Sequence, residues 1–277
     1  MTDVVHGSAA QQERLQPHPA APTALWDVVT AVHRWQFWTF LAWQDIRQRY
    51  RGSKLGPFWT VANVAFVAAG VGLLYSGIFN EDLNTFVPFL TAGIIFWFLI
   101  ANCVSDSTVA FQQGGSMIRQ AALPLFAFPL RVVTRNVIVL AHNALVYIAI
   151  CFIFAVRPNL VWLIPGVVLL VLNVGWVTVL CALLGARYRD AVQMIQNALT
   201  LVLFLSPIFW RPGQASGRAV MVHYNPVAHL LEIVRTPALG SPPNMDSIWI
   251  CLAMAAIGWI VALGVFLRVR HRIVHWL

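Results

Sequence analysis

Charged side chains are scarce in this chain of 277 residues: Asp, Glu, Lys and Arg together make up 10% of it, whereas hydrophobic residues make up 59%. Soluble domains typically carry about 25% charged residues. With a mean hydropathy of +0.72, the chain has more apolar surface than one globular core of this length can bury, so the surplus must face lipid. The composition excludes an ordinary soluble enzyme and indicates a polytopic membrane protein.

Lysine is nearly absent, and this excludes a nucleotide-binding motif. The one lysine, Lys54, follows Ser53, whereas a phosphate-binding P-loop needs Gly-Lys-Ser or Gly-Lys-Thr. If the protein uses ATP, a partner must therefore hydrolyse it. The other basic residues are arginines, and the net charge is +8.

Paired cysteines and catalytic motifs are also missing. The four cysteines lie in apolar stretches without a Cys-x-x-Cys pair, which indicates buried free thiols. The chain has no His-Glu-x-x-His metal motif and no Gly-x-Ser-x-Gly motif. We therefore expect neither a metal site nor catalysis by this chain alone. One enzymatic alternative stays open: a membrane-embedded transferase acting on lipid-linked sugars, with His223, His229 and Glu232 as its site.

Long apolar runs dominate the rest of the chain. A helix needs roughly 17–25 residues to cross a bilayer core, and six segments meet this length: 57–79, 86–104, 136–156, 160–184, 191–210 and 248–267. The sequence therefore predicts an all-α polytopic membrane protein with six transmembrane helices in residues 51–277.

The basic residues predict the orientation of these spans, because Lys and Arg collect on the cytoplasmic side. Fourteen of the eighteen basic residues fall in the N-terminal arm, the second-to-third and fourth-to-fifth connections and the C-terminus. Both termini are therefore expected in the cytoplasm, with the protein in the inner, or plasma, membrane.

Two segments outside the spans are too organised to be plain loops. Residues 25–50 place Leu25, Val29 and Val32 on one helical face opposite Asp27, which predicts an amphipathic helix in the membrane interface. Residues 211–247 carry apolar runs too short to span, which predicts short re-entrant or gate helices on the outer side. Residues 1–24 read as a disordered tail.

The polar residues inside the predicted spans disfavour ion-driven transport. Coupling ions need Asp, Glu, Lys or Arg at membrane depth, and the middle of each span holds only neutral groups: Asn63, His142, Asn143, Asn173, Gln196 and Asn197. What remains is a passive pathway. The first span combines small residues, among them Ala65, Ala68, Ala69 and Gly72, with several aromatic residues.

Aromatic rings stack on the apolar faces of sugars, so the predicted pathway suits a glycan. The pore-lining candidates are Trp59, Phe66, Tyr75, Phe204 and Trp210. The six spans of one chain are too few to line a wide path, so two copies of the chain must pair. The simplest expectation is therefore a homodimer. Ser206-Pro207 should break the fifth span near its outer end.

Five motifs in order resemble one family. They are WQDIRQRYRGSKLGPFW (43–59), AHN (141–143), ARYRD (186–190), FLSPIFWRP (204–212) and YNPVAHLLEIVRTPALG (224–240). From about residue 40 onward the chain resembles the ABC exporter permeases that move bacterial polysaccharides such as O-antigen, capsule, teichoic acid and galactan, and it is most similar to the O-antigen and galactan branch.

The resemblance implies partners that this chain would need. Permeases of that family form homodimers bound to two copies of a separate ATPase subunit, which would hold the ATP and Mg. The implied substrate is a glycan on a polyprenyl pyrophosphate lipid, moved from the cytoplasmic to the outer leaflet. No nucleic acid is implied as a partner. An ABC permease for a drug or a small lipid stays open as an alternative.

The resemblance also implies roles for particular residues. Arg47, Arg49, Arg51 and Lys54 would lie where the lipid pyrophosphate arrives, since arginine suits bidentate phosphate contacts. The segment 111–120 resembles the family's coupling helix, with Phe111, Gln112 and Arg119 as contacts for the ATPase. The outer gate candidates are Pro207, Tyr224, Asn225, Pro226 and His229.

Overall fold

The structure, a computed structural model, describes residues 23–53, 56, 58–79, 81–120, 123–211 and 223–276, without the side chains of residues 75, 76 and 79. Within these ranges all regular structure is helical. The helices are α2 (Ala24–His33), α3 (Trp35–Arg49), α4 (Phe58–Phe79), α5 (Leu83–Ser107), α6 (Ala110–Gln113), α7 (Gly115–Gln120), α8 (Ala127–Ile153), α9 (Leu160–Arg187), α10 (Ala191–Leu205), α12 (Pro226–Ala238) and α13 (Met245–Trp276).

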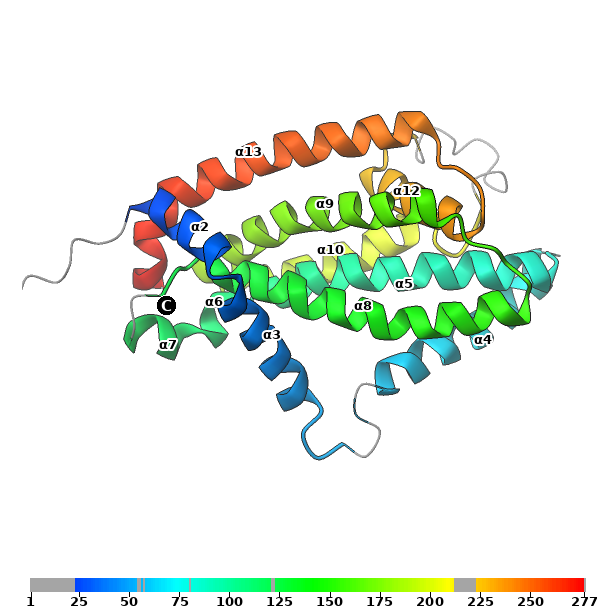
Figure 1. The fold of residues 1–277 in the computed structure, drawn as a ribbon, viewed down its shortest axis with the longest axis horizontal. Coiled ribbons are helices and arrows are strands. Elements are labelled where there is room, and N and C mark those ends of the chain that lie inside the picture. The colour runs from blue at the N-terminus through cyan, green and yellow to red at the C-terminus, as the bar shows by residue number, and fades with distance from the viewer. Residues whose placement is uncertain are drawn as a thin grey trace, which may run out of the picture.

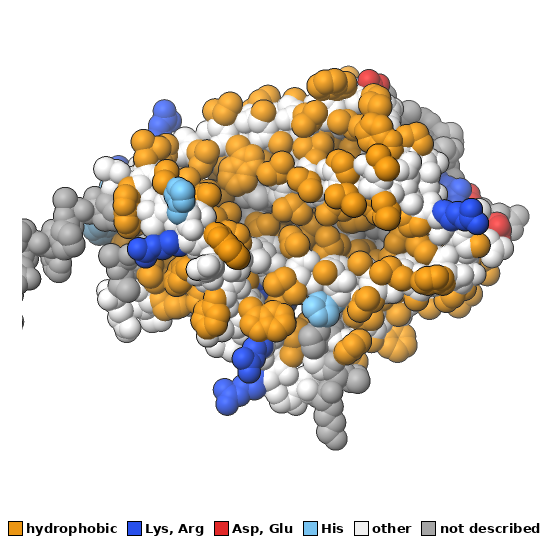
Figure 2. Space-filling view, in the orientation of Figure 1, with side chains coloured by type: hydrophobic (Ala, Val, Ile, Leu, Met, Phe, Trp, Pro, Cys, Tyr) orange, Lys and Arg blue, Asp and Glu red, His pale blue; other side chains and the backbone are white. Residues whose placement is uncertain are grey.

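The long helices run along one axis, and the short helices gather at its two ends (Figure 1). Helices α2, α3, α6 and α7 lie at one end, beside the C-terminal end of α13, and α12 lies at the other. Figure 2 shows that the middle of the visible face is covered by hydrophobic side chains, while the charged ones lie near its edges. This distribution is typical of a protein that crosses a membrane along the long axis.

Four helices are long and apolar enough to cross a membrane: α5, α8, α9 and α13. The multi-pass helical class predicted from the sequence is therefore confirmed. Shorter apolar stretches cover Phe58–Leu74 of α4 and Ala191–Leu205, which is α10. The predicted count of six spans depends on these two helices and stays a prediction.

Two helices differ in extent from the predicted spans. The third predicted span starts at residue 136, inside α8, which begins at Ala127; Arg131 and Arg135 in the first part of this helix are paired with Asp45 and Asp106. The fifth predicted span reaches residue 210, whereas its helix, α10, ends at Leu205. There the chain turns at Ser206, directly before Pro207, where the sequence predicts a break.

The predicted amphipathic helix is two helices, because the backbone at Arg34 leaves the helical region between α2 and α3. The apolar face of α2 points away from the protein: Leu25, Val29 and Val32 are 66%, 53% and 57% exposed. In an interfacial helix such a face is directed to lipid.

The opposite face of α2 docks on the protein through Asp27, which is fully buried. The Asp27 carboxylate accepts hydrogen bonds from the backbone N–H of Phe126 and from Nε of Arg270, both at 2.9 Å. It thereby joins three segments far apart in the sequence: α2, the loop before α8 and the end of α13. The amphipathic pattern identified both faces of the helix, but it did not show that the polar face is buried.

Tight packing at Gly185 fixes the C-terminal end of α9 against the C-terminal end of α5. A Cβ atom at Gly185 would overlap the backbone carbonyl of Thr108. The carbonyl oxygen of Gly185 also accepts a hydrogen bond from Nε2 of Gln112 in α6, at 3.0 Å. The contact therefore positions the short helices that follow α5.

We predict that Gly185→Ala lowers the thermal unfolding midpoint of the purified protein, since overpacking a close contact costs about 1–3 kcal/mol. The matched control is Gly264→Ala in α13, where a Cβ would meet nothing within 4 Å; alanine there should leave the midpoint unchanged or raise it. Fluorescence-detected chromatography after heating measures both. Equal midpoints for the two variants would contradict this account of the contact.

Candidate functional site

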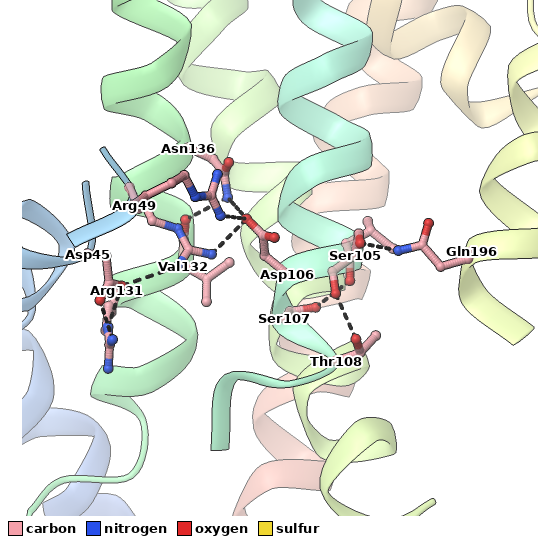
Figure 3. Close-up of polar contacts among 12 residues, drawn as sticks. Asp45, Arg49, Ser105, Asp106, Ser107, Thr108, Arg131, Val132, Asn136 and Gln196 are labelled. Atoms are coloured by element: carbon pink, nitrogen blue, oxygen red, sulfur yellow. Dashed lines mark hydrogen bonds and ion pairs between the residues drawn. The ribbon is translucent and has the colours of Figure 1, made fainter. Parts of the chain in front are cut away.

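A cluster of charged residues ties α3 to α5 and α8 at the end of the molecule that carries the short helices (Figure 3). We call it the inner ion-pair cluster; it comprises Asp45, Arg49, Asp106, Arg131, Arg135 and Asn136. Asp45 of α3 accepts two hydrogen bonds from Arg131, one of them from Nε at 2.6 Å. Arg135 lies between two carboxylates, 3.2 Å from Asp45 and 2.7 Å from Asp106.

How strongly each ion pair stabilises the position of α3 depends on how deeply its side chains are buried. The side chains of Arg131, Arg135 and Asp45 are only 14%, 6% and 10% exposed, and removing one partner from a buried pair costs about 3–5 kcal/mol. The contact between Arg49 and Asp106 is weaker, because the atoms lie 3.6 Å apart and Arg49 is 44% exposed. The buried pairs therefore hold α3 in place.

The arginines predicted to meet a lipid pyrophosphate lie at the end of α3. Arg47 and Arg51 are exposed, whereas Arg49 shares Asp106 with Arg135 and Asn136. Lys54 lies outside the described residues. Arg47 and Arg51 are therefore accessible to an anion, and Arg49 is partly occupied by the cluster.

The segment predicted to contact an ATPase forms α6 and α7. Phe111 is 1% exposed and packs against Phe128, with ring centroids 6.1 Å apart, so it supports the segment from within instead of forming its outer surface. Gln112 is held by Gly185, as described above. Arg119, at the end of α7, is exposed. Of the three residues, Arg119 is best placed to meet a partner.

The outer gate candidates meet where α10 ends and α12 begins. Asn225 caps α12, its Oδ1 accepting from the backbone N–H of Val227 at 2.9 Å, and its Nδ2 donates to Oγ of Ser206 at 3.0 Å. Pro207 is buried. Pro226 occupies the first turn of α12, and Tyr224 is 78% exposed. Asn225 thus bonds the break after α10 to the short helix α12.

Arg235 also contributes to this contact between the end of α10 and α12, although it was not among the predicted site residues. It is 3% exposed, donates from Nη1 to the carbonyl oxygen of Pro207 at 2.5 Å, and lies 4.1 Å from the ring centre of Phe89. Burial lowers the pKa of Arg235 well below its usual value, to about 10, and the charge of Glu232 opposes that shift. The guanidinium therefore remains charged at neutral pH and clamps α12 onto α5 and the end of α10.

The residues of the alternative transferase site lie in and just before α12, where the ring centroids of His223 and His229 are 6.2 Å apart. Both ring nitrogens of His229 are engaged, Nδ1 with Oγ of Ser247 at 2.9 Å and Nε2 with the carbonyl oxygen of His223 at 2.8 Å. Ser247 is 4% exposed, so His229 is tied to a buried group. In the described part of the chain, no three His, Cys, Asp or Glu residues are grouped to hold a metal. His229 therefore links α12 to the start of α13.

The aromatic pore-lining candidates lie on two helices. Trp59 and Phe66 of α4 are 56% and 74% exposed, and Phe204 of α10 is 65% exposed; Trp210 is half-buried. The side chain of Tyr75 lies outside the described residues. Both α4 and α10 pack on α5 but not closely on each other, so one chain does not bring these rings together.

One face of α10 is exposed and polar. Gln193, Asn197, Thr200 and Phe204 follow one another at spacings of three and four residues and are all exposed, so they share a helix face. We call it the polar α10 face. The neighbouring face carries Met194, Leu201 and Leu205, which are also exposed. Helix α10 therefore has one surface suited to lipid and one suited to water or to polar partners.

Comparison with known proteins identifies the class and then the family. A multi-pass helical chain with short helices at one end and a short, buried helix at the other has the architecture of a membrane permease. Residues 36–239 match the ABC-2 type transporter family, and the chain belongs to it. It is therefore a transport subunit and not an enzyme, and membership implies partnership with an ATPase subunit.

The similar proteins are O-antigen export permeases. The O-antigen export system permease protein RfbA of Klebsiella pneumoniae is 23% identical over 234 residues, covering 83% of this chain and 90% of that protein. The RfbA protein of Myxococcus xanthus is 24% identical over 196 residues, covering 69% and 75%. The family resemblance in the sequence motifs is thus confirmed.

We predict that Asp45→Asn loosens α3, because the guanidinium of Arg131 then loses its carboxylate and that of Arg135 keeps only Asp106. At about 3 kcal/mol for a broken buried pair, amide hydrogen exchange in α3 should accelerate by roughly 100-fold. The control, Asp246→Asn, removes an exposed carboxylate at the start of α13 and should leave α3 unchanged. Wild-type protection of α3 in Asp45→Asn would show that the cluster does not hold the helix.

Proposed function

We propose that the protein is the membrane subunit of an ATP-driven exporter that moves a polyprenyl-pyrophosphate-linked polysaccharide of the O-antigen type across the inner membrane. Both termini lie in the cytoplasm in this proposal, together with α2, α3, α6 and α7. The basic residues of these elements and of the end of α13 support that orientation. The relatives named for O-antigen export support the substrate class.

The observation that carries the proposal is the polar α10 face. Gln193 donates from Nε2 to Oδ1 of Asn197 at 3.2 Å, and the Thr200 hydroxyl donates to the carbonyl oxygen of Gln196 at 3.1 Å. Each amide can form further hydrogen bonds that hydrocarbon cannot supply, and an unsatisfied polar group in an apolar medium costs several kcal/mol. The face therefore suits water or a polar partner better than lipid. It borders a hydrated path in which amides exchange hydrogen bonds with sugar hydroxyls. Phe204, on the same face one turn further out, offers a ring on which a sugar can stack.

A second copy of the chain completes this path. Helices α4 and α10 expose their aromatic and polar faces on either side of the contact with α5. A single chain cannot enclose a glycan between them, whereas a homodimer places two such surfaces around one axis. Closure of the outer end then falls to α12, held by Asn225 and Arg235.

The ATPase provides the energy from the cytoplasmic side. The proposed contact is the α6–α7 segment, with Arg119 at its surface and its base fixed by Gln112 on Gly185. ATP and Mg bind to two copies of the partner and not to this chain. Movement of α6 is transmitted to α5 and α9, which this helix contacts directly.

The test is to purify the chain with the ATPase subunit encoded beside it and to measure ATP hydrolysis with and without the lipid-linked glycan. We expect a stable complex, stimulation by the glycolipid, and roughly tenfold less stimulation for Arg119→Glu, which corresponds to about 1.4 kcal/mol of lost interaction. The matched control is Arg268→Glu, an exposed arginine of α13, which should behave as the wild type.

Failure to bind any ATPase would refute the proposal. Deletion of the gene distinguishes the alternative of a drug or small-lipid permease: polymer should accumulate inside the cell if the proposed substrate is correct. Normal surface display of the polymer after deletion would contradict the proposal.

A further inference from the structure

A groove between α4, α5 and α8 at the outer end of the molecule is not explained by the transport pathway. Its volume is ≈ 790 Å³, within the range of about 300–1,000 Å³ typical of ligand-binding pockets. Its wall is apolar, with Ala65, Ala69 and Leu73 on α4 and Val146 and Ile150 on α8. The groove is therefore large enough for a ligand and suited to a hydrocarbon one.

The small residues of α4 divide between two surfaces. Gly72 is buried, and a Cβ there would come 3.2 Å from Val87 of α5, so this residue serves helix packing. Ala68 is 2% exposed and lies where the packed surface of α4 meets the wall of the groove. Ala65 and Ala69 are exposed and line the groove. Close packing thus explains one half of the small-residue pattern but not the other.

The groove matches the depth of one membrane leaflet. The stretch from Ala65 to Gly77 rises by roughly 18 Å along α4, and one leaflet contributes about 15 Å of hydrocarbon. Its polar mouth is formed by Glu81, Asp82 and Asn84, at the start of α5. An acyl chain in the groove would therefore place its headgroup at these residues.

The charges at the mouth have both signs. Asp82 is exposed, and among the described residues no cation lies within ion-pair distance of it. Arg211, 34% exposed, lies 3.6 Å from Glu81 and donates to Oγ1 of Thr85 at 3.1 Å. Because Glu81 is paired with Arg211, the exposed carboxylate of Asp82 is the group at the mouth that complements the ammonium of a headgroup.

We propose that this groove binds a phospholipid of the outer leaflet with an ethanolamine headgroup, one acyl chain lying against Ala65 and Ala69 and the ammonium group at Asp82. Water does not fill an apolar groove at membrane depth, and an anionic headgroup would meet the negative charge of Asp82. The site is separate from the polar α10 face, and it does not depend on the substrate that the protein exports.

The test is native mass spectrometry of the purified, delipidated full chain titrated with phosphatidylethanolamine or phosphatidylglycerol. The wild type should bind phosphatidylethanolamine about threefold more tightly, the size expected of an exposed ion pair. Asp82 caps α5, its Oδ1 accepting from the backbone N–H of Asn84 at 3.1 Å. Asp82→Asn removes the charge but keeps this cap, because Asn and Asp cap equally well; binding should persist and the preference should disappear.

Filling the groove tests its wall. Ala69→Phe, or Ala65→Leu as a milder second variant, should reduce binding of both lipids at least severalfold, whereas Leu74→Phe, on α4 but off the groove, should not. Thermal unfolding of each variant verifies that it is folded.

Four results would overturn the proposal: unchanged lipid binding in both folded groove variants, an ethanolamine preference that survives Asp82→Asn, preferential binding of polyprenyl phosphate offered as a competitor, or loss of a homodimer on filling the groove. The last two would assign the groove to the carrier lipid or to a second copy of the chain.

Discussion

Two aspartates hold together the end of this protein that carries α2, α3, α6 and α7. Asp45 and Asp106 neutralise the buried guanidinium groups of Arg131 and Arg135, and without them α8 could not carry two arginines into the bundle. The same pairs attach α3 to the two spanning helices α5 and α8. Because Asp106 lies next to the end of α5, the cluster also borders the short helices that we assign to the ATPase contact.

At the opposite end of the molecule, buried polar groups also have partners within the chain, although these partners are not ion pairs. Arg235 satisfies the carbonyl of Pro207, and Asn225 bonds Ser206, so the backbone groups freed by the break after α10 are paired within the protein. At both ends, then, polar groups at or near membrane depth have partners inside the chain. The polar α10 face differs in exposure: Gln193 and Asn197 bond each other, but both remain exposed in a single chain, and this exposure is the reason to place the pathway there.

The sequence predicts the helices well because long apolar runs are local signals. Each of the six predicted segments falls on a helix, and the break at Ser206-Pro207 follows from the missing backbone donor of proline. The family motifs likewise pointed to an export permease. Hydropathy alone could not predict that α8 begins at Ala127, because it takes Arg131 and Arg135 as signs of a boundary.

The ion pairs could not be predicted from the sequence, because their members are distant in it. Asp45 meets Arg131 across 86 residues, and Asp27 meets Arg270 across 243. Periodicity places Asp27 on the polar face of a helix but does not show whether that face meets water or protein. One sequence signal does point to these ion pairs: aspartates are outnumbered by arginines in the basic segments outside the spans, so each aspartate there is a candidate partner for a buried arginine.

The central claim is that the polar α10 face borders water and its neighbouring face borders lipid. The direct measurement replaces the four native cysteines, introduces Asn197→Cys or Leu201→Cys, and follows their labelling by a charged maleimide in membranes that contain the whole complex. Thiolates form and react in water and not in hydrocarbon. The account predicts labelling of Asn197→Cys about tenfold faster than of Leu201→Cys; equal rates, or the reverse order, would contradict it.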